Sequence, residues 1–336
     1  MPTTRSANKG EWSELYAFVK LLKDGKVYAA DENVNRIEEY YLPILKIIRQ
    51  ETQEEKLEFF TGETTIKVYE NGSLVEEITK SILEEKSMLL FQKIFRGAAG
   101  TDSSGAFRID ELNDFMDQMH IEKVKAPSTE KVDINMQVHD VNTGYSPVVG
   151  FSIKSDIGSA PTLMNPGKNT RIRYKITGIS ADDIHEINSI NETTDREYMK
   201  ARLGLLFQRA QNICFDKIKD VTFNENLMMI DSLMPRIYGE IVLCHYKNIE
   251  NGIYDCDQLI PIVKKDNPIG YSNTSLYEYK LKKLLTASAL GMTPGRSWSG
   301  LESATGGYII IKRDGDVLCY HIYNRNFFEA YLLKNT

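Results

Sequence analysis

Near the middle of this 336-residue chain, two short runs rich in β-branched residues flank a segment of turn-forming residues. The runs are residues 132–138 and 148–153, and the segment between them contains Asn142, Gly144 and Pro147. Such a pattern is typical of a β-hairpin, which fixes two neighbouring strands of a sheet. We therefore expect an antiparallel hairpin at the centre of the fold.

The register of this hairpin decides which polar side chains meet. With the turn centred near residues 143–144, Asp133 pairs with Lys154 and Asn135 pairs with Ser152. Residues two apart on a strand point to the same face, so all four side chains could enter one site. Taken alone, an Asp–Lys pair of this kind is more often an ordinary cross-strand ion pair.

An aspartate entering one strand, followed by the tripeptide Ser152-Ile153-Lys154 on the next strand, resembles the PD-(D/E)xK nucleases. Three longer stretches narrow the resemblance to the HpaII family of type II restriction endonucleases. They are NKGEWSELY near the start, GFSIKSDIGSAPTLMNPGKNT in the middle and GGYIIIKRDGDVLCYHIYNRN near the end. Because they lie so far apart, the resemblance extends over the whole chain.

This resemblance implies an α/β (mixed α+β) fold, in which a restriction-endonuclease-like mixed sheet is flanked by helices and carries the catalytic hairpin at its centre. It implies an endodeoxyribonuclease that cuts double-stranded DNA at a short palindrome, CCGG, leaving 5′-phosphate and 3′-hydroxyl ends. Mg²⁺ would stabilise the phosphoryl charge and lower the pKa of a bound water. A companion DNA cytosine methyltransferase of the same restriction–modification system is expected. A homodimer suits a palindromic site, although some such enzymes work as monomers.

The resemblance also assigns roles on the hairpin. Asp133 is the expected first metal ligand, and Lys154 is expected to stabilise developing negative charge or orient the attacking water. Ser152 stands where the superfamily pattern has an acid, and a hydroxyl is a poor, neutral ligand for Mg²⁺. Asp140 is the alternative aspartate, but the register above puts it near the turn, roughly 20 Å along the strand from Lys154.

A first helix is predicted over residues 8–23, where apolar residues recur at helical spacing and Asn8 with Glu11 forms a capping-box pattern. Glu11 and Glu14 lie in or beside its apolar sector, whereas charge at a helix N-terminus is the simpler explanation for both. The pattern of Lys9, Gly10 and Glu14 resembles the first helix of Holliday-junction resolvases, in which the glutamate helps to hold metal. Glu14 is therefore the expected second metal ligand, with Glu11 as the alternative.

A polar loop over residues 156–170 and an alternating strand over residues 171–176 follow the hairpin. Such side chains contact phosphate oxygens and base edges in DNA complexes, although a solvated strand face explains the basic residues equally well. The candidate DNA-binding residues are Asn165, Lys168, Asn169, Thr170, Arg171 and Arg173.

The remaining chain divides by pattern into residues 1–125, an N-terminal helix and α+β region, and residues 126–336. The second part holds the hairpin, the DNA-contact loop and a C-terminal helical and hairpin part, and both parts could form one continuous endonuclease domain. Residues 180–290 are expected to be mostly helical, with a break at Pro235 and a strand-like segment over 237–244.

Composition sets few limits on function. A net charge of −6 does not exclude DNA binding, because a local basic face matters more than the total charge. The four scattered cysteines are expected to be reduced thiols, and neither a signal peptide nor a membrane span is seen. We therefore expect a cytoplasmic protein with no membrane partner. Five histidines without a Cys/His cluster disfavour a zinc enzyme.

Two other functions compete with this assignment. Ser152 favours a catalytically silent DNA-binding protein of the same fold, whereas Asp133, Lys154 and the acidic first helix count against it. A structure-specific nuclease of the resolvase type would cut DNA junctions irrespective of CCGG.

Overall fold

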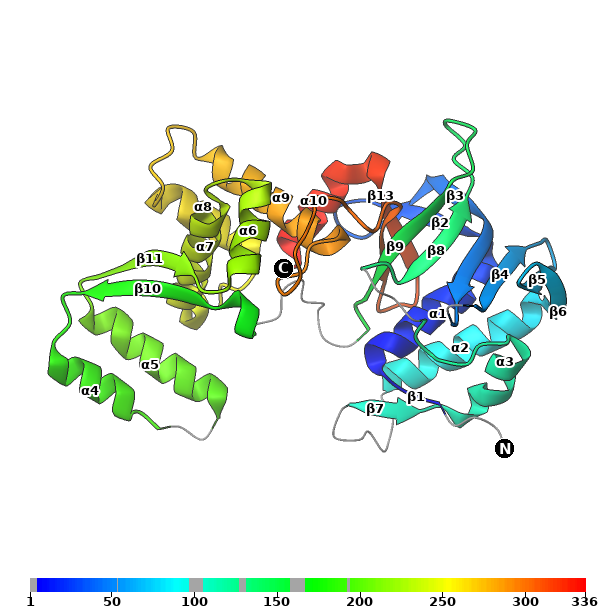
Figure 1. The fold of residues 1–336 in the computed structure, drawn as a ribbon, viewed down its shortest axis with the longest axis horizontal. Helices are drawn as coiled ribbons and strands as arrows, with labels where there is room; N and C mark the ends of the chain where they lie inside the picture. Colours follow the sequence, from blue (N-terminus) through cyan, green and yellow to red (C-terminus); the bar gives the residue numbers. More distant parts are fainter. Residues whose placement is uncertain (1–4, 53, 97–104, 127–130, 158–166, 192–193) are drawn as a thin grey trace. The chain divides into compact units, whose positions relative to one another are not determined.

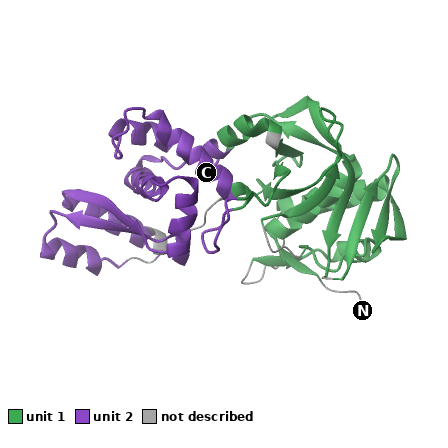
Figure 2. Cartoon of the chain, turned by 45° about the horizontal axis from the view of Figure 1, so that its top comes forward, with its two compact units in different colours: residues 1–161, 289–291, 301–331 green, residues 162–288, 292–300, 332–336 purple. Residues whose placement is uncertain are grey.

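The computed structural model describes residues 5–52, 54–96, 105–126, 131–157, 167–191 and 194–336 (Figure 1). The chain forms two compact units (Figure 2). The first unit contains residues 1–161, 289–291 and 301–331, and the second contains residues 162–288, 292–300 and 332–336. The division predicted after residue 125 stays a prediction.

The first unit is built on a mixed nine-stranded sheet in the order β2-β13-β12-β9-β8-β3-β4-β5-β6. Most neighbours are antiparallel, but β12 pairs with β9, and β13 with β2, in parallel. The predicted mixed sheet flanked by helices is confirmed. The strands of this sheet are β2 (Lys26–Ala30), β3 (Arg36–Gln50), β4 (Lys56–Thr61), β5 (Thr65–Glu70), β6 (Ser73–Thr79), β8 (Ile134–Val138), β9 (Val148–Ser155), β12 (Gly307–Ile311) and β13 (Val317–His321).

The long strand β3 has different partners along its length. Its first half pairs with β2 (Tyr28↔Tyr41), and its second half pairs with β8 (Ile47↔Met136) and with β4. Strands β2, β13, β12, β9, β8 and β3 therefore form a closed circuit of pairings. The strand is 15 residues long, which lets it pair with different strands along its length.

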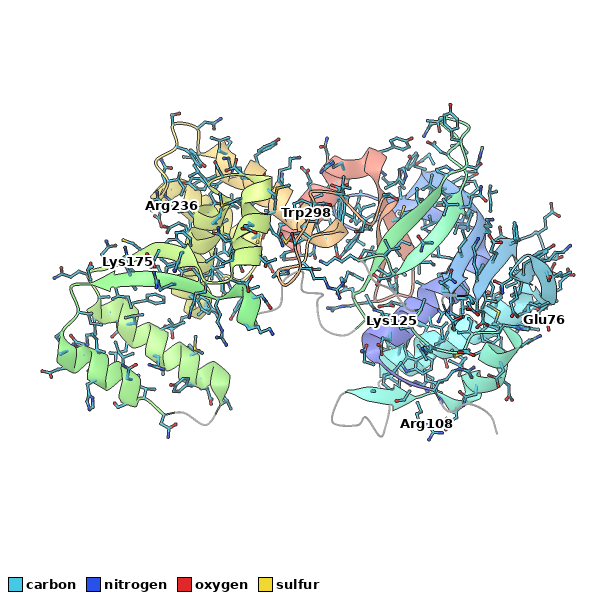
Figure 3. All side chains as sticks on the ribbon, viewed as in Figure 1. Glu76, Arg108, Lys125, Lys175, Arg236 and Trp298 are labelled. Carbon is cyan, nitrogen blue, oxygen red and sulfur yellow. The ribbon has the colours of Figure 1, made fainter. Side chains whose placement is uncertain are left out.

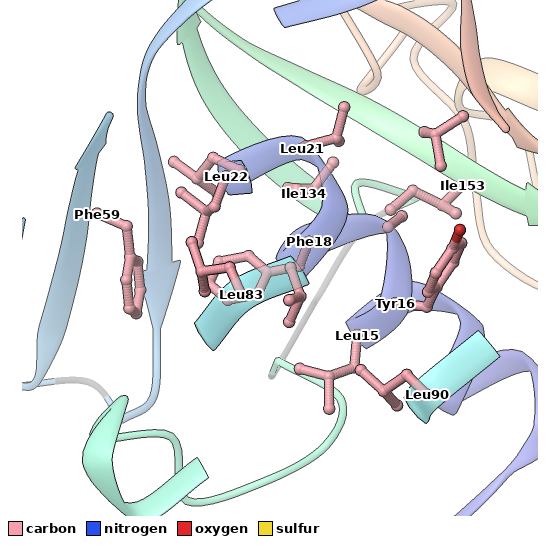
Figure 4. Packing of buried hydrophobic residues seen from close by; sticks show 14 of the residues in the cluster. Leu15, Tyr16, Phe18, Leu21, Leu22, Phe59, Leu83, Leu90, Ile134 and Ile153 are labelled. Carbon is pink, nitrogen blue, oxygen red and sulfur yellow. The ribbon is translucent and has the colours of Figure 1, made fainter. Parts of the chain in front are cut away.

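Helix α1 (Lys9–Asp24) supplies much of the core of the first unit. The predicted capping box is present: the Asn8 side chain accepts from the Glu11 N–H, and the Glu11 carboxylate accepts from the Asn8 N–H. Figure 4 shows Leu15, Phe18 and Leu22 of this helix among buried residues of the sheet and of helix α2 (Lys80–Arg96). The other elements are the paired short strands β1 (Ser6–Asn8) and β7 (Ala106–Arg108), and helices α3 (Asn113–Gln118) and α10 (Arg325–Lys334), whose last residues belong to the second unit.

The second unit combines a two-stranded antiparallel ribbon with helices. The predicted break at Pro235 is confirmed, because Pro235 lies in the first turn of helix α7 (Met234–Asn248). The strand-like prediction over residues 237–244 is wrong, since these residues lie inside α7. The ribbon strands are β10 (Ile172–Thr177) and β11 (Asn212–Ile218), and the other helices are α4 (Ala181–Ser189), α5 (Asp195–Arg209), α6 (Val221–Ile230), α8 (Cys256–Asp266) and α9 (Ser275–Leu290).

Across the described ranges, no helix is both long enough and apolar enough to cross a membrane.

Candidate active site

Asp133 lies immediately before β8 and is bonded to the facing strand β9. Its Oδ2 accepts a hydrogen bond from the backbone N–H of Ile153 at 2.7 Å and from the Ser152 hydroxyl at 3.3 Å. Its own N–H donates to the Phe151 carbonyl at 2.9 Å. One carboxylate oxygen of Asp133 is thus fixed by β9, and Oδ1 is left for other partners.

The predicted pairing of Asp133 with Lys154 is wrong by two residues. Ile134 pairs with Phe151 and Asn135 with Gly150, so Asp133 faces Ser152 instead. A slip of two residues keeps every side chain on its original face, because the side-chain period of a strand is two.

The cause of the slip lies in the connection between the strands, where Asp140 organises the chain. Its N–H donates to the Tyr145 carbonyl, and its carboxylate accepts from the N–H of Asn142 and the hydroxyl of Thr143. Tyr323, near the C-terminus, adds a hydroxyl donor at 2.5 Å. These hydrogen bonds, that of Tyr323 first, lower the pKa of Asp140 to about 2. Asp140 is therefore occupied in shaping the loop.

Glu14 faces Asp133 from α1. Burial of its side chain, which is 18% exposed, and then the negative charge of Asp133 raise the pKa of Glu14 to about 7. Lys125 opposes this rise, because its Nζ lies 3.1 Å from Glu14 Oε1 and 3.8 Å from Asp133 Oδ1. Lys154 acts on Glu14 in the same direction through its charge. The structure therefore brings two carboxylates and two lysines together in the first unit.

The other predicted members of the site differ in what they contact. Ser152 is 3% exposed and donates to Asp133. The Glu11 carboxylate is engaged in the capping box at the start of α1. Lys154 is half-buried on β9 and interacts electrostatically with Lys131, whose pKa falls to about 8 through burial and this repulsion.

A divalent metal fits this set of donors. Glu14 and Asp133 Oδ1 offer hard oxygen ligands. Because burial and the charge of Asp133 raise the pKa of Glu14, a cation nearby would favour the ionised form of Glu14. Among the described residues, no group of three or more His, Cys, Asp or Glu side chains is arranged to hold a metal. Mg²⁺ is usually bound by one or two carboxylates with water and substrate phosphate as the other ligands, so two carboxylates suffice.

The described candidate DNA-binding residues all belong to the second unit, whereas Glu14, Asp133 and Lys154 belong to the first unit. Asn165 falls outside the described residues. Lys168, Asn169 and Thr170 form one short 3-10 turn, in which the Asn169 amide donates to Asp220 at 2.8 Å. Arg171 is exposed just before β10. The predicted strand over residues 171–176 is confirmed as β10.

An acidic residue partly neutralises the basic face of this strand. The Arg173 guanidinium donates to Asp216 of β11, and Lys175 lies 3.4 Å from the same carboxylate. Figure 3 labels Lys175 on β10.

Sequence reasoning missed Lys125 and the residues that hold it. A buried Arg49–Glu51 ion pair at the end of β3 binds the backbone before Lys125: Arg49 donates to the carbonyls of Lys123 and Val124. A cavity of about 60 Å³ between β3 and α1 is lined by Arg49, Glu14 and Asp133, among others. No local signal marks these residues, because β3 and residue 125 meet only through the tertiary fold.

This chain resembles a known family of proteins. A family model described as HpaII restriction endonuclease matches residues 8–336. The chain is 38% identical to the type II restriction enzyme HpaII of Haemophilus parainfluenzae, over 98% of this chain and 89% of that enzyme. No solved structure matches significantly. The two matches confirm the resemblance inferred from the sequence.

Proposed function

Because the chain belongs to the HpaII restriction endonuclease family, and is thus a type II site-specific deoxyribonuclease, we propose that it cuts duplex DNA at CCGG by Mg²⁺-dependent hydrolysis. The observation that supports the chemistry most is the meeting of Glu14 and Asp133, from α1 and the catalytic hairpin, beside Lys154. The recognition sequence in this proposal, CCGG, is the one that the family resemblance implies.

Each residue has a distinct role in this proposal. Glu14 and Asp133 Oδ1 hold Mg²⁺, which when bound supplies positive charge for the phosphoryl oxygens and lowers the pKa of a bound water. The Ile153 N–H and the Ser152 hydroxyl orient Asp133 from behind. Lys154 stabilises the negative charge that develops on the scissile phosphate.

Ser152 acts in this scheme as a positioning residue. Its hydroxyl donates to the Asp133 carboxylate at 3.3 Å and is buried, so the serine supports a metal ligand from the place where the superfamily pattern has an acid. Glu14 then carries more of the negative charge that a dication requires.

DNA contacts in this proposal come from the turn at residues 168–170 and from Arg171 and Arg173, which are cationic or polar and lie close in sequence. Arg or Lys would read guanine edges, and the remaining polar groups would contact phosphates. We extend the proposal to a cytoplasmic enzyme, acting as a homodimer on its palindrome, with a companion DNA cytosine methyltransferase.

A plasmid digest with and without Mg²⁺, with a parallel plasmid methylated at the inner cytosine of CCGG, tests the reaction, its metal requirement and its recognition site. Fragments ending at CCGG that disappear on methylation or chelation are the expected result. Fragments ending at other sequences would keep the nuclease and overturn the recognition site. Absence of cutting, with DNA still retarded in a gel, would favour a silent DNA-binding protein, the alternative that Ser152 raises. Cutting confined to DNA junctions would favour a resolvase-type enzyme.

A further inference from the structure

Lys125 occupies the position between the two carboxylates of the candidate active site. Its Nζ lies 3.1 Å from Glu14 Oε1 and 3.8 Å from Asp133 Oδ1. The other Asp133 oxygen, Oδ2, is already bonded to Ile153 and Ser152. The ammonium group therefore faces the one Asp133 oxygen that remains for a cation.

The backbone leading to Lys125 is held by buried groups. Arg49, paired with the fully buried Glu51 carboxylate, donates to the carbonyls of Lys123 and Val124. Glu51 accepts from the Glu122 N–H at 3.3 Å.

A second buried arginine, Arg5, donates to the carbonyls of Ile121 and Glu122, at 2.6 and 2.9 Å. Two buried arginines thus hold the backbone of residues 121–124. Because this backbone is fixed, Lys125 begins beside the two carboxylates.

The side chain of Lys125, in contrast, has room to leave. It is 41% exposed, whereas those of Glu14 and Asp133 are 18% and 15% exposed. A magnesium ion requires carboxylate oxygens at about 2.0–2.1 Å, so an ammonium bonded to the same oxygens and a dication would compete for one position. Rotation of the lysine into solvent removes that conflict without moving the anchored backbone.

We propose that Lys125 is a built-in counter-ion, which holds Glu14 and Asp133 together in the metal-free enzyme and is displaced when a divalent metal binds. This inference rests on the metal site of the proposed function. Lys125 is a positioning residue in this role. Its effect is to weaken metal binding while keeping the two ligands in place.

Manganese binding tests the proposal without DNA and without activity. Mn²⁺ prefers the same oxygen ligands as Mg²⁺, and free Mn²⁺ is counted by electron paramagnetic resonance in titrations of the full chain at pH 8. The variants are K125M, K125R and D133N. The matched control is K123M, which removes an exposed lysine two residues away whose backbone is held by the same arginine.

K125M is expected to bind Mn²⁺ about two- to fivefold more tightly than K123M. This ratio corresponds to the free energy of one partly exposed ion pair, which the metal no longer has to break. K125R, which keeps a cation, is expected to bind like the wild type. In EDTA, K125M should unfold at a lower temperature than K123M, and saturating Mn²⁺ should remove that difference.

Equal Mn²⁺ affinity of K125M and K123M, with binding lost in D133N, would overturn the counter-ion role and leave the metal site standing. Wild-type affinity in D133N would overturn the metal site itself, and with it both proposals.

Discussion

The backbone N–H of Ile153 donates to the carboxylate of Asp133 at 2.7 Å, and this bond ties the residue before β8 to the strand that carries Lys154. A main-chain donor cannot rotate away, so the direction of the carboxylate is set by the sheet itself. Oδ1 lies on the side of Lys125, 3.8 Å from its Nζ. The sheet thus fixes the direction of the carboxylate that we propose as a metal ligand.

Replacing Lys154 by Ala is expected to lower the rate of DNA cutting by about a hundredfold or more, since it removes a cation proposed to stabilise the charged transition state. DNA binding should remain within a few-fold of wild type. Single-turnover cleavage and gel retardation of the same CCGG duplex measure the two effects. An unchanged rate would show that Lys154 is not part of the active site. The control is K123A, which removes an exposed lysine.

Glu14→Gln is expected to change how stability depends on pH in the absence of metal. The pKa of Glu14 is about 7 in the folded protein against an ordinary value of 4.5, so between these pH values the folded state holds a proton that the unfolded chain has released. The contribution of Glu14 to stability therefore falls as the pH rises from about 4.5 to about 7.

The Gln variant lacks this penalty and should be more stable than the wild type at pH 8, by roughly 1–3 kcal/mol, and equally stable at pH 4. Urea unfolding in EDTA at the two pH values measures the difference. A constant difference across the range would mean that Glu14 titrates normally.

Asp140→Ala distinguishes the two aspartates of the hairpin region. The variant loses the acceptor for Tyr323, Thr143 and Asn142, and should be less stable by roughly 2 kcal/mol. Since the pKa of Asp140 is lowered to about 2, its stabilising effect is present above its ordinary value of 3.8 and is lost as the pH falls toward 2.

Cutting by the folded Asp140→Ala protein should stay within about threefold of wild type, whereas Asp133→Ala should lose about a hundredfold or more. Cleavage assays well below both unfolding temperatures make the comparison. The opposite ranking would identify Asp140 as the active aspartate.

Arg49→Met should destabilise the first unit strongly. It leaves the Glu51 carboxylate, which is fully buried, without its charged partner, and breaking such a pair costs about 3–5 kcal/mol. The double variant R49M/E51M removes both charges and should be less destabilised than R49M alone. Chemical unfolding of the three proteins provides the measurement, and a loss below about 1 kcal/mol in R49M would contradict the anchoring role.

Asp216→Asn is expected to strengthen DNA binding and to make it more sensitive to salt. The substitution releases Arg173 and Lys175, and each new phosphate contact steepens the salt dependence by about 0.9. Arg171→Ala should weaken DNA binding and make the salt dependence shallower by about 0.9, the slope that one phosphate contact contributes. Asp182→Asn, which removes an exposed acid from α4, is the control for charge alone. Fluorescence anisotropy at several salt concentrations gives the slopes, and equal slopes for D216N and D182N would remove β10 from the DNA interface.

Local sequence signals predicted much of this fold. The Asn8–Glu11 capping box begins α1, and the dipeptide Asn71-Gly72, typical of hairpin turns and with positive φ at both residues, forms the turn between β5 and β6. In each case a few neighbouring residues contain all the interactions that determine the structure.

Features set by distant partners could not be predicted in this way. The register of the β8–β9 hairpin depends on Asp140 and on Tyr323, which is 183 positions away. The extent of β3 depends on its successive partners β2 and β8, and β11 falls inside a region whose apolar spacing favours helices. Glu14 and Asp133 were predicted from family resemblance, whereas Lys125 carries no motif and is brought to them by Arg49.

The strand that carries Lys154 has its second neighbour far away in the sequence, since Ile310 of β12 lies beside Lys154 in parallel register. A polypeptide still being synthesised, or one released after residue 306, has β9 exposed along one edge and the circuit of strands open. Such a strand is held on one side only, and its exposed amides and carbonyls remain available to other chains. The strand that carries Lys154 is therefore held on both sides only after β12 has been synthesised and has paired with it.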